Sequence, residues 1–154
     1  MSLEDMYQEI ILDHYRKPLN RAPSLEDEAV AVHHSNPLCG DEMDLRLRVV
    51  DDAVDAVVFD GEGCSISQAA ASAMTDAVIG RDLKDALDLT EDFRRMMHGD
   101  EPARADDLKD GVAFQGVAKF PVRVKCALLG WMALKDAIET YERGASAHTV
   151  THEE

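Results

Sequence analysis

Three cysteines and one aspartate are the residues of this sequence whose types and spacing could do chemistry. Cys39 and Asp41 stand together in the stretch NPLCGD, Cys64 directly follows GEG, and Cys126 closes KFPVRVKC. Three thiolates and a carboxylate form a four-donor set suited to tetrahedral zinc. The same cysteines could instead include a single nucleophile, or be three unrelated buried side chains, because cysteine is among the residue types most often found inside proteins.

The surroundings of the cysteines favour the metal-binding interpretation. Cys64 is expected at a helix N-terminus, where the partial positive charge of the helix stabilises a thiolate. Zinc with three thiolates and one carboxylate would leave two negative charges uncompensated, so cations are expected nearby. Arg123 and Lys125, which bracket Cys126, are the obvious candidates. Spacing alone leaves the choice between a metal site and three unrelated cysteines open.

The elements that must position these residues follow from the hydrophobic pattern. Apolar residues at helical spacing predict helices over residues 3–16, 65–79, 81–98 (as one or two) and 121–141. Alternating apolar and polar residues predict an antiparallel hairpin over 43–61 and a short strand over 29–35. We expect Ser65 or Ser67 to cap the helix that follows Cys64. This order predicts an α+β fold, in which a small antiparallel sheet of about three strands packs against helices.

Length and charge limit the classes of function. At 154 residues the chain is most simply a single domain over residues 1–144, with a flexible C-terminal tail over 145–154. A net charge of −15 argues against nucleic acid and against an anionic membrane surface as partners. No apolar run approaches the roughly 20 residues of a membrane-spanning helix, and the acidic N-terminus lacks the features of a signal peptide. We therefore expect a cytoplasmic protein with reduced thiols.

Taken together, the motifs NPLCGD, GEGCSISQAAAS and FPVRVKCALLGW resemble the SufU-like branch of the IscU/NifU N-terminal-type iron–sulfur cluster assembly proteins. The resemblance runs from ILDHYRKP to the last helix, and it implies a small antiparallel sheet covered by helices. It implies Cys39, Asp41, Cys64 and Cys126 as zinc ligands, with Cys39 also the persulfide acceptor. The implied partners are a pyridoxal-phosphate-dependent cysteine desulfurase (SufS-like), whose histidine takes the zinc and releases Cys39, and downstream cluster assembly proteins.

Two departures separate this chain from the IscU scaffold branch. Lys125 stands where that branch has a histidine directly before the last cysteine, and KFPVRVK has only Pro121 where that branch has paired prolines. These differences favour a persulfide carrier that acts with a desulfurase, rather than an independent turnover enzyme. Two alternatives remain open, namely a scaffold that holds a transient iron–sulfur cluster and a purely structural zinc domain that docks to partners.

Overall fold

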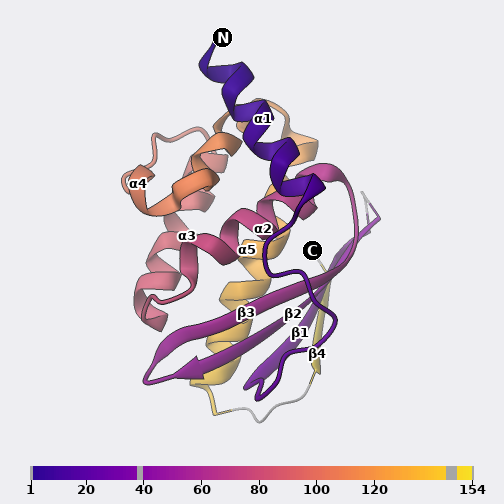
Figure 1. Cartoon of the computed structure of the whole chain (residues 1–154), viewed down its shortest axis with the longest axis vertical. Coiled ribbons are helices and arrows are strands. Elements are labelled where there is room, and N and C mark those ends of the chain that lie inside the picture. The colour runs from indigo at the N-terminus through magenta and orange to yellow at the C-terminus, as the bar shows by residue number, and fades with distance from the viewer. Residues whose placement is uncertain (1, 38–39, 145–148, 154) are drawn as a thin grey trace.

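In the computed structural model, which describes residues 2–37, 40–144 and 149–153, the helices lie on one face of a four-stranded sheet (Figure 1). The strands are β1 (Val30–Asn36), β2 (Asp41–Val50), β3 (Ala53–Glu62) and β4 (Thr149–Glu153). The helices are α1 (Leu3–Arg16), α2 (Ser65–Val78), α3 (Leu83–Met97), the short α4 (Ala105–Leu108), the 3₁₀ helix η1 (Lys109–Lys119) and α5 (Pro121–Glu142). The predicted α+β class and the covering of one sheet face by helices are confirmed.

The sheet has the strand order β3-β2-β1-β4. Of the three strands expected from the sequence, β2 is central and pairs antiparallel with both β1 and β3. The hairpin between β2 and β3 turns at Asp51 and Asp52, which both adopt left-handed backbone conformations with φ of 52° and 58°. Consecutive left-handed residues are typical of the two-residue turns whose twist matches that of the flanking strands. A bulge between Arg48 and Val49 then shifts the pairing by one residue, so that Leu45 lies opposite Phe59.

The end of the chain differs from the flexible tail expected over residues 145–154. The backbone of Thr149–Glu153 forms β4, which pairs parallel with β1 from Ala31 to Ser35. The stretch Thr149–Thr151 consists of β-branched residues, which favour strands, and the outer edge of β1 offers backbone groups that need partners. The division of the chain at residue 144 stays a prediction.

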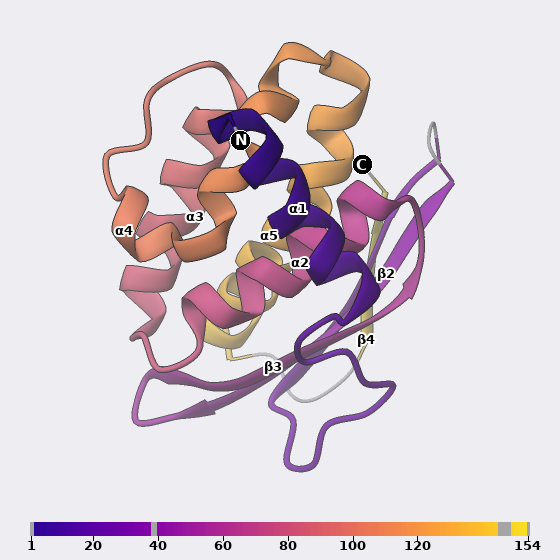
Figure 2. The same ribbon diagram turned by 45° about the horizontal axis from the view of Figure 1, so that its top comes forward.

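The centre of the molecule is the contact between the inner face of the sheet and the two helices α2 and α5 (Figure 2). The alanines of α2 let α5 approach closely, because a Cβ added at Gly130 would lie only 3.0 Å from the Cβ of Ala71. The next residue of α5, Trp131, stacks on Phe93 of α3 with ring centroids 4.8 Å apart. Helices packed this tightly hold their N-terminal turns at fixed positions beside the sheet.

The helix α1 is tied to α2 and η1 through a buried histidine. His14 Nδ1 lies 2.7 Å from Ser72 Oγ, and its Nε2 lies 2.8 Å from Asp110 Oδ2. The backbone N–H of Leu19 also donates to Ser72 Oγ. Both ring nitrogens of His14 therefore have hydrogen-bond partners, and its role is to hold α1 against α2 and η1. None of the helices that the structure describes combines the length and the apolar character needed to cross a membrane.

Candidate metal centre

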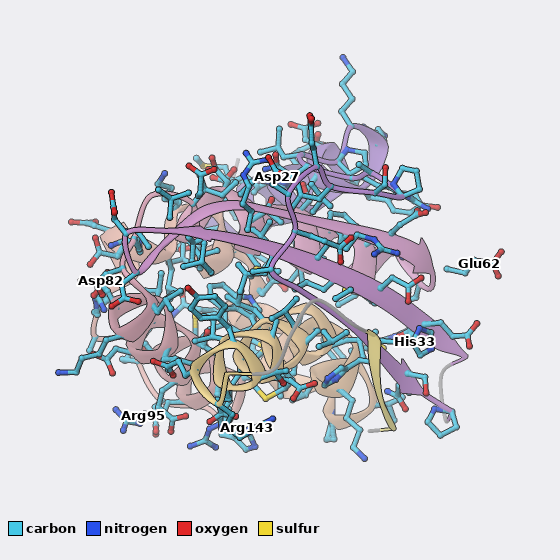
Figure 3. The ribbon with its side chains drawn as sticks, turned by 90° about the horizontal axis from the view of Figure 1, so that it is seen from below. Asp27, His33, Glu62, Asp82, Arg95 and Arg143 are labelled. Atoms are coloured by element: carbon cyan, nitrogen blue, oxygen red, sulfur yellow. The ribbon has the colours of Figure 1, made fainter. Side chains whose placement is uncertain are left out.

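Three of the four residues expected to bind metal meet at one end of the sheet. Asp41 begins β2, Cys64 immediately precedes α2, and Cys126 lies in the second turn of α5. One donor atom from each, the carboxylate oxygen and the two sulfurs, lies within 4.8 Å of the others. Figure 3 shows Glu62, two residues before Cys64, at this end of the sheet and Asp82 at the opposite end. Cys39, the fourth expected ligand, lies outside the described residues.

Asp41 is held as a buried carboxylate that faces the helices. Side chains alternate along β2, so Asp41 lies on the same inner face of the sheet as Met43, and both are fully buried. Its Oδ1 accepts a hydrogen bond of 2.9 Å from the backbone N–H of Cys64, and its Oδ2 lies 4.0 Å from Cys64 Sγ. Burying a carboxylate is costly unless it is paired with a cation or coordinates a metal. The position of Asp41 therefore points to a bound cation.

Cys64 occupies the N-cap position of α2, which corrects the expected capping by Ser65 or Ser67. Its backbone is extended, and its side chain makes no capping hydrogen bond. The Ser67 hydroxyl donates instead to the carbonyl oxygen of Cys64 at 3.0 Å and lies 3.9 Å from its sulfur. The physical reason is that the Asp41 carboxylate takes the N–H of Cys64, which orients the cysteine toward β2. The thiol thus lies at the positive end of a helix, where a thiolate is stabilised.

Cys126 and Arg123 come from the same helical face at the start of α5, three residues apart. Cys126 is fully buried, with its sulfur 3.8 Å from the carbonyl oxygen of Val122. The charge of the Cys64 thiolate, and after it a hydrogen bond with Cys126, raises the pKa of Arg123. The guanidinium therefore faces both sulfurs. Lys125 is exposed and lines a hollow with Met97 and His98, so of the two expected cations the structure brings Arg123 to the thiols.

The described donor set fits a thiophilic divalent metal ion. Tetrahedral zinc with bonds of about 2.0–2.3 Å sets its ligand atoms roughly 3.3–3.8 Å apart, which a small contraction of the observed donor set would reach. Two thiolates and the Asp41 carboxylate carry three negative charges, which a divalent ion and the Arg123 guanidinium together balance. A soft sulfur pair with one carboxylate suits zinc or iron better than magnesium or calcium.

Gly63 is a residue of this site that the sequence pattern did not single out. A Cβ added there would lie 2.7 Å from Asp41 Oδ1 and 2.5 Å from Ser67 Oγ. The signal was present in GEGC, because a glycine directly before a ligand often marks close approach to the backbone.

Gly63→Ala should therefore weaken metal binding. The added methyl group displaces the carboxylate that it meets, and disturbing the groups that orient a ligand typically costs 10–100-fold in affinity. Competition titration with a chromophoric chelator measures the change. Gly116→Ala is the matched control, since a Cβ at Gly116 meets nothing within 4 Å. Equal affinities of the two variants would show that the Asp41 carboxylate is not held where the metal binds.

Arg123→Gln should lower metal affinity about tenfold, because loss of the guanidinium leaves one negative charge of the donor set unbalanced. Lys125→Gln makes the same change of net charge two residues away, on a side chain that lines a different hollow. The same titration, repeated at low and high salt, separates a local effect from one of overall charge. If both variants lose affinity equally, the specific role of Arg123 is refuted.

The protein is a four-stranded α+β domain with two cysteine thiols and a carboxylate at one end of its sheet. These features are typical of proteins that bind a metal ion or carry sulfur on cysteine side chains. The family model described as "NifU-like N terminal domain" matches residues 6–127, a segment that contains Cys39 and all three described donors. The chain belongs to this family, and the resemblance stated from the motifs is confirmed.

Within the family, two curated relatives align over nearly the whole chain. The zinc-dependent sulfurtransferase SufU of Bacillus subtilis is 42% identical over 143 residues, which are 93% of this chain and 96% of the relative. The iron–sulfur cluster assembly scaffold protein IscU of Streptococcus pyogenes is 39% identical over 149 residues, 97% of this chain and 91% of the relative. The similarity thus reaches relatives named for sulfur transfer and relatives named as scaffolds.

Solved structures agree with the fold. The N-terminal part of a nitrogen-fixing NifU-like protein from Brucella abortus superposes with a TM-score of 0.79 at 26% identity, over 93% of this chain and 99% of that one. A candidate scaffold protein for the SUF system from Fervidobacterium islandicum superposes with a TM-score of 0.73 at 31% identity, over 89% and 99%.

Proposed function

We propose that this protein is a zinc-dependent persulfide acceptor, which takes sulfur from a cysteine desulfurase and relays it to iron–sulfur cluster assembly in the cytoplasm. The observation that carries the proposal is the buried donor set of Asp41, Cys64 and Cys126 with Arg123 beside both sulfurs. The similarity to a relative named a zinc-dependent sulfurtransferase supports the choice of metal and of reaction.

In this proposal Asp41, Cys64 and Cys126 are the permanent zinc ligands, and Cys39 is the fourth ligand and the acceptor. Zinc bound there keeps a thiolate unprotonated yet masked from other reagents. The described residues supply the fixed part of the site. Asp41 is locked by the N–H of Cys64, and the guanidinium of Arg123 limits the negative charge. Gly40, with φ of 71°, closes the turn through its N–H to the carbonyl oxygen of Asn36.

The transfer step follows the chemistry of thiol–disulfide exchange. The Cys39 thiolate attacks the outer sulfur of a persulfide on the desulfurase cysteine. A new sulfur–sulfur bond forms on Cys39, the sulfur–sulfur bond of the desulfurase breaks, and the electron pair leaves with the desulfurase thiolate. The exchange needs no external oxidant or reductant. A SufS-like pyridoxal-phosphate enzyme is the proposed donor, and cluster assembly proteins are the proposed recipients.

A scaffold function is the second candidate, and the 39% identity with a relative named as an IscU scaffold supports it. The same thiolates could hold a transient iron–sulfur cluster. Lys125 favours the relay, because its side chain is an exposed ammonium that lines a separate hollow and adds no ligand to the donor set. Anaerobic reconstitution that yields a stable coloured cluster, transferable to an apo-protein, would favour the scaffold.

The test of the proposal is metal analysis of the purified protein, combined with persulfide mapping after incubation with a desulfurase and cysteine. We expect about one zinc per chain and, by mass spectrometry under non-reducing conditions, an added sulfur on the peptide that contains Cys39. Zinc without any persulfide would support a structural docking domain. Absence of both would defeat the proposal.

A further inference from the structure

One buried side chain beside the metal centre has polar atoms that no hydrogen bond satisfies. Gln68 is 3% exposed, and neither its amide oxygen nor its amide nitrogen has a hydrogen-bond partner within residues 2–37, 40–144 and 149–153. Buried side-chain polar atoms are hydrogen-bonded in the large majority of cases, and leaving them unpaired costs stability. The buried amide of Gln68 therefore lowers the stability of the fold, and a function of this side chain would explain why it is there.

The position of Gln68 on α2 places it next to the donor set. It is the fourth residue of α2, and Cys64 is the N-cap directly before that helix. Long side chains on helices lean toward the N-terminus and cover the turn before their own. For Gln68 that turn begins at Cys64, the residue whose sulfur belongs to the donor set.

The two helical neighbours that follow Gln68 have no free acceptor for its amide. Ala71, three residues later, has no polar side-chain atom. Ser72, four residues later, already uses its hydroxyl oxygen, which accepts the N–H of Leu19 and bonds to His14. The sulfur of Cys64 lies 4.0 Å from Asp41 Oδ2 and 3.9 Å from Ser67 Oγ, and the Arg123 guanidinium also faces it. The two contacts with oxygen are long for hydrogen bonds, and a thiolate sulfur can accept from more than one donor, so it can take a further N–H.

We propose that Gln68 is a positioning residue of the metal centre, whose amide N–H donates a hydrogen bond to the Cys64 thiolate when metal is bound. The inference rests on the proposed metal site but goes beyond the ligand set. Three side-chain torsions let the amide reach the sulfur by rotation. A neutral amide can donate to the thiolate without changing the net charge of the site. Hydrogen bonds to metal ligands orient them and tune their donation to the metal.

The proposal predicts that the stability of the fold and the affinity for metal change in opposite directions. Gln68→Leu keeps the buried volume and removes the unsatisfied amide, so the chelator-treated variant should melt no lower than wild type. Its affinity for Co²⁺, used as a spectroscopic probe in place of zinc, should fall about tenfold. The thiolate-to-cobalt charge-transfer band should move to longer wavelength, because an unbonded thiolate gives up its electrons more readily.

The matched control is Gln115→Leu, which changes a partly buried glutamine of η1 whose partner is the hydroxyl of Tyr7. It should leave the cobalt spectrum and affinity unchanged. Gln68→Met serves if Gln68→Leu does not fold. A Gln68 variant with wild-type affinity and an unshifted band would overturn the proposal while leaving the metal site intact. A wild-type protein that binds neither cobalt nor zinc would overturn both.

Discussion

Replacing Cys39 by alanine is expected to abolish the stimulation of a cysteine desulfurase by this protein. The acceptor thiolate forms the new sulfur–sulfur bond, so its loss should lower the stimulated rate by about two orders of magnitude or more, as removal of a reacting nucleophile does in enzymes. Asp41, Cys64 and Cys126 remain in the variant, so it should still fold and keep measurable affinity for zinc. Alanine production by the desulfurase, at saturating cysteine and with increasing amounts of variant, gives the rate.

Ser35→Ala provides the control for this experiment, since Ser35 lies on β1 at the same end of the sheet, opposite Glu42, and is not a member of the donor set. It should stimulate like wild type. Persulfide mapping on the wild type distinguishes a wrong acceptor residue from the absence of sulfur transfer to Cys39. Added sulfur found on Cys64 or Cys126 would move the acceptor role to that residue. Full stimulation by Cys39→Ala would refute acceptance of sulfur by Cys39 altogether.

Much of the fold could be predicted because local signals and tertiary packing agree. Ser2 caps α1 with a reciprocal hydrogen-bond pair to Asp5, and Pro121 begins α5, both at positions the local pattern predicts. The β4 strand could not be predicted, because three β-branched residues near the end of the chain do not by themselves indicate a strand until the edge of β1 offers them backbone partners. Pairing between segments so distant in sequence leaves no local periodicity.

The candidate site was predictable as a set of residue types but not as an arrangement. The sequence indicates which thiols and carboxylate could bind metal, and the structure brings three of them within 4.8 Å. The sequence could not decide whether Arg123 or Lys125 lies beside the thiols, because that depends on the direction in which each side chain leaves α5. Nor could the sequence predict that Asp41 would accept a hydrogen bond from the N–H of Cys64, which places a cysteine rather than a serine at the N-cap of α2.

Removing zinc is expected to lower the melting temperature of the protein without unfolding it at room temperature. The core does not depend on the site, since Trp131, Phe93 and the inner face of the sheet are buried against one another away from the donors. The donor set does depend on metal, because three acidic groups within 4.8 Å repel one another when they are ionised. The loss should therefore be largest where β2, α2 and α5 converge.

The size of this effect follows from linkage between binding and folding. Metal present at 1,000 times its dissociation constant stabilises the folded state by about 4 kcal/mol. For a chain of this length each kcal/mol shifts the melting temperature by roughly 2–4 °C, so treatment with a chelator should lower it by about 10 °C. Thermal melts followed by circular dichroism measure the shift, and one equivalent of zinc, but not of magnesium, should restore the original value.

Cys126→Ser is the matched control for zinc removal, because it lacks one ligand from the start. It should melt low with or without the chelator and should respond weakly to added zinc. Hydrogen exchange should then report faster opening in the first turns of α2 and α5, while the segment around Trp131 stays protected. A wild-type protein whose melting temperature is unmoved by the chelator, and which is shown by metal analysis to have lost its zinc, would contradict a stabilising metal centre at Asp41, Cys64 and Cys126.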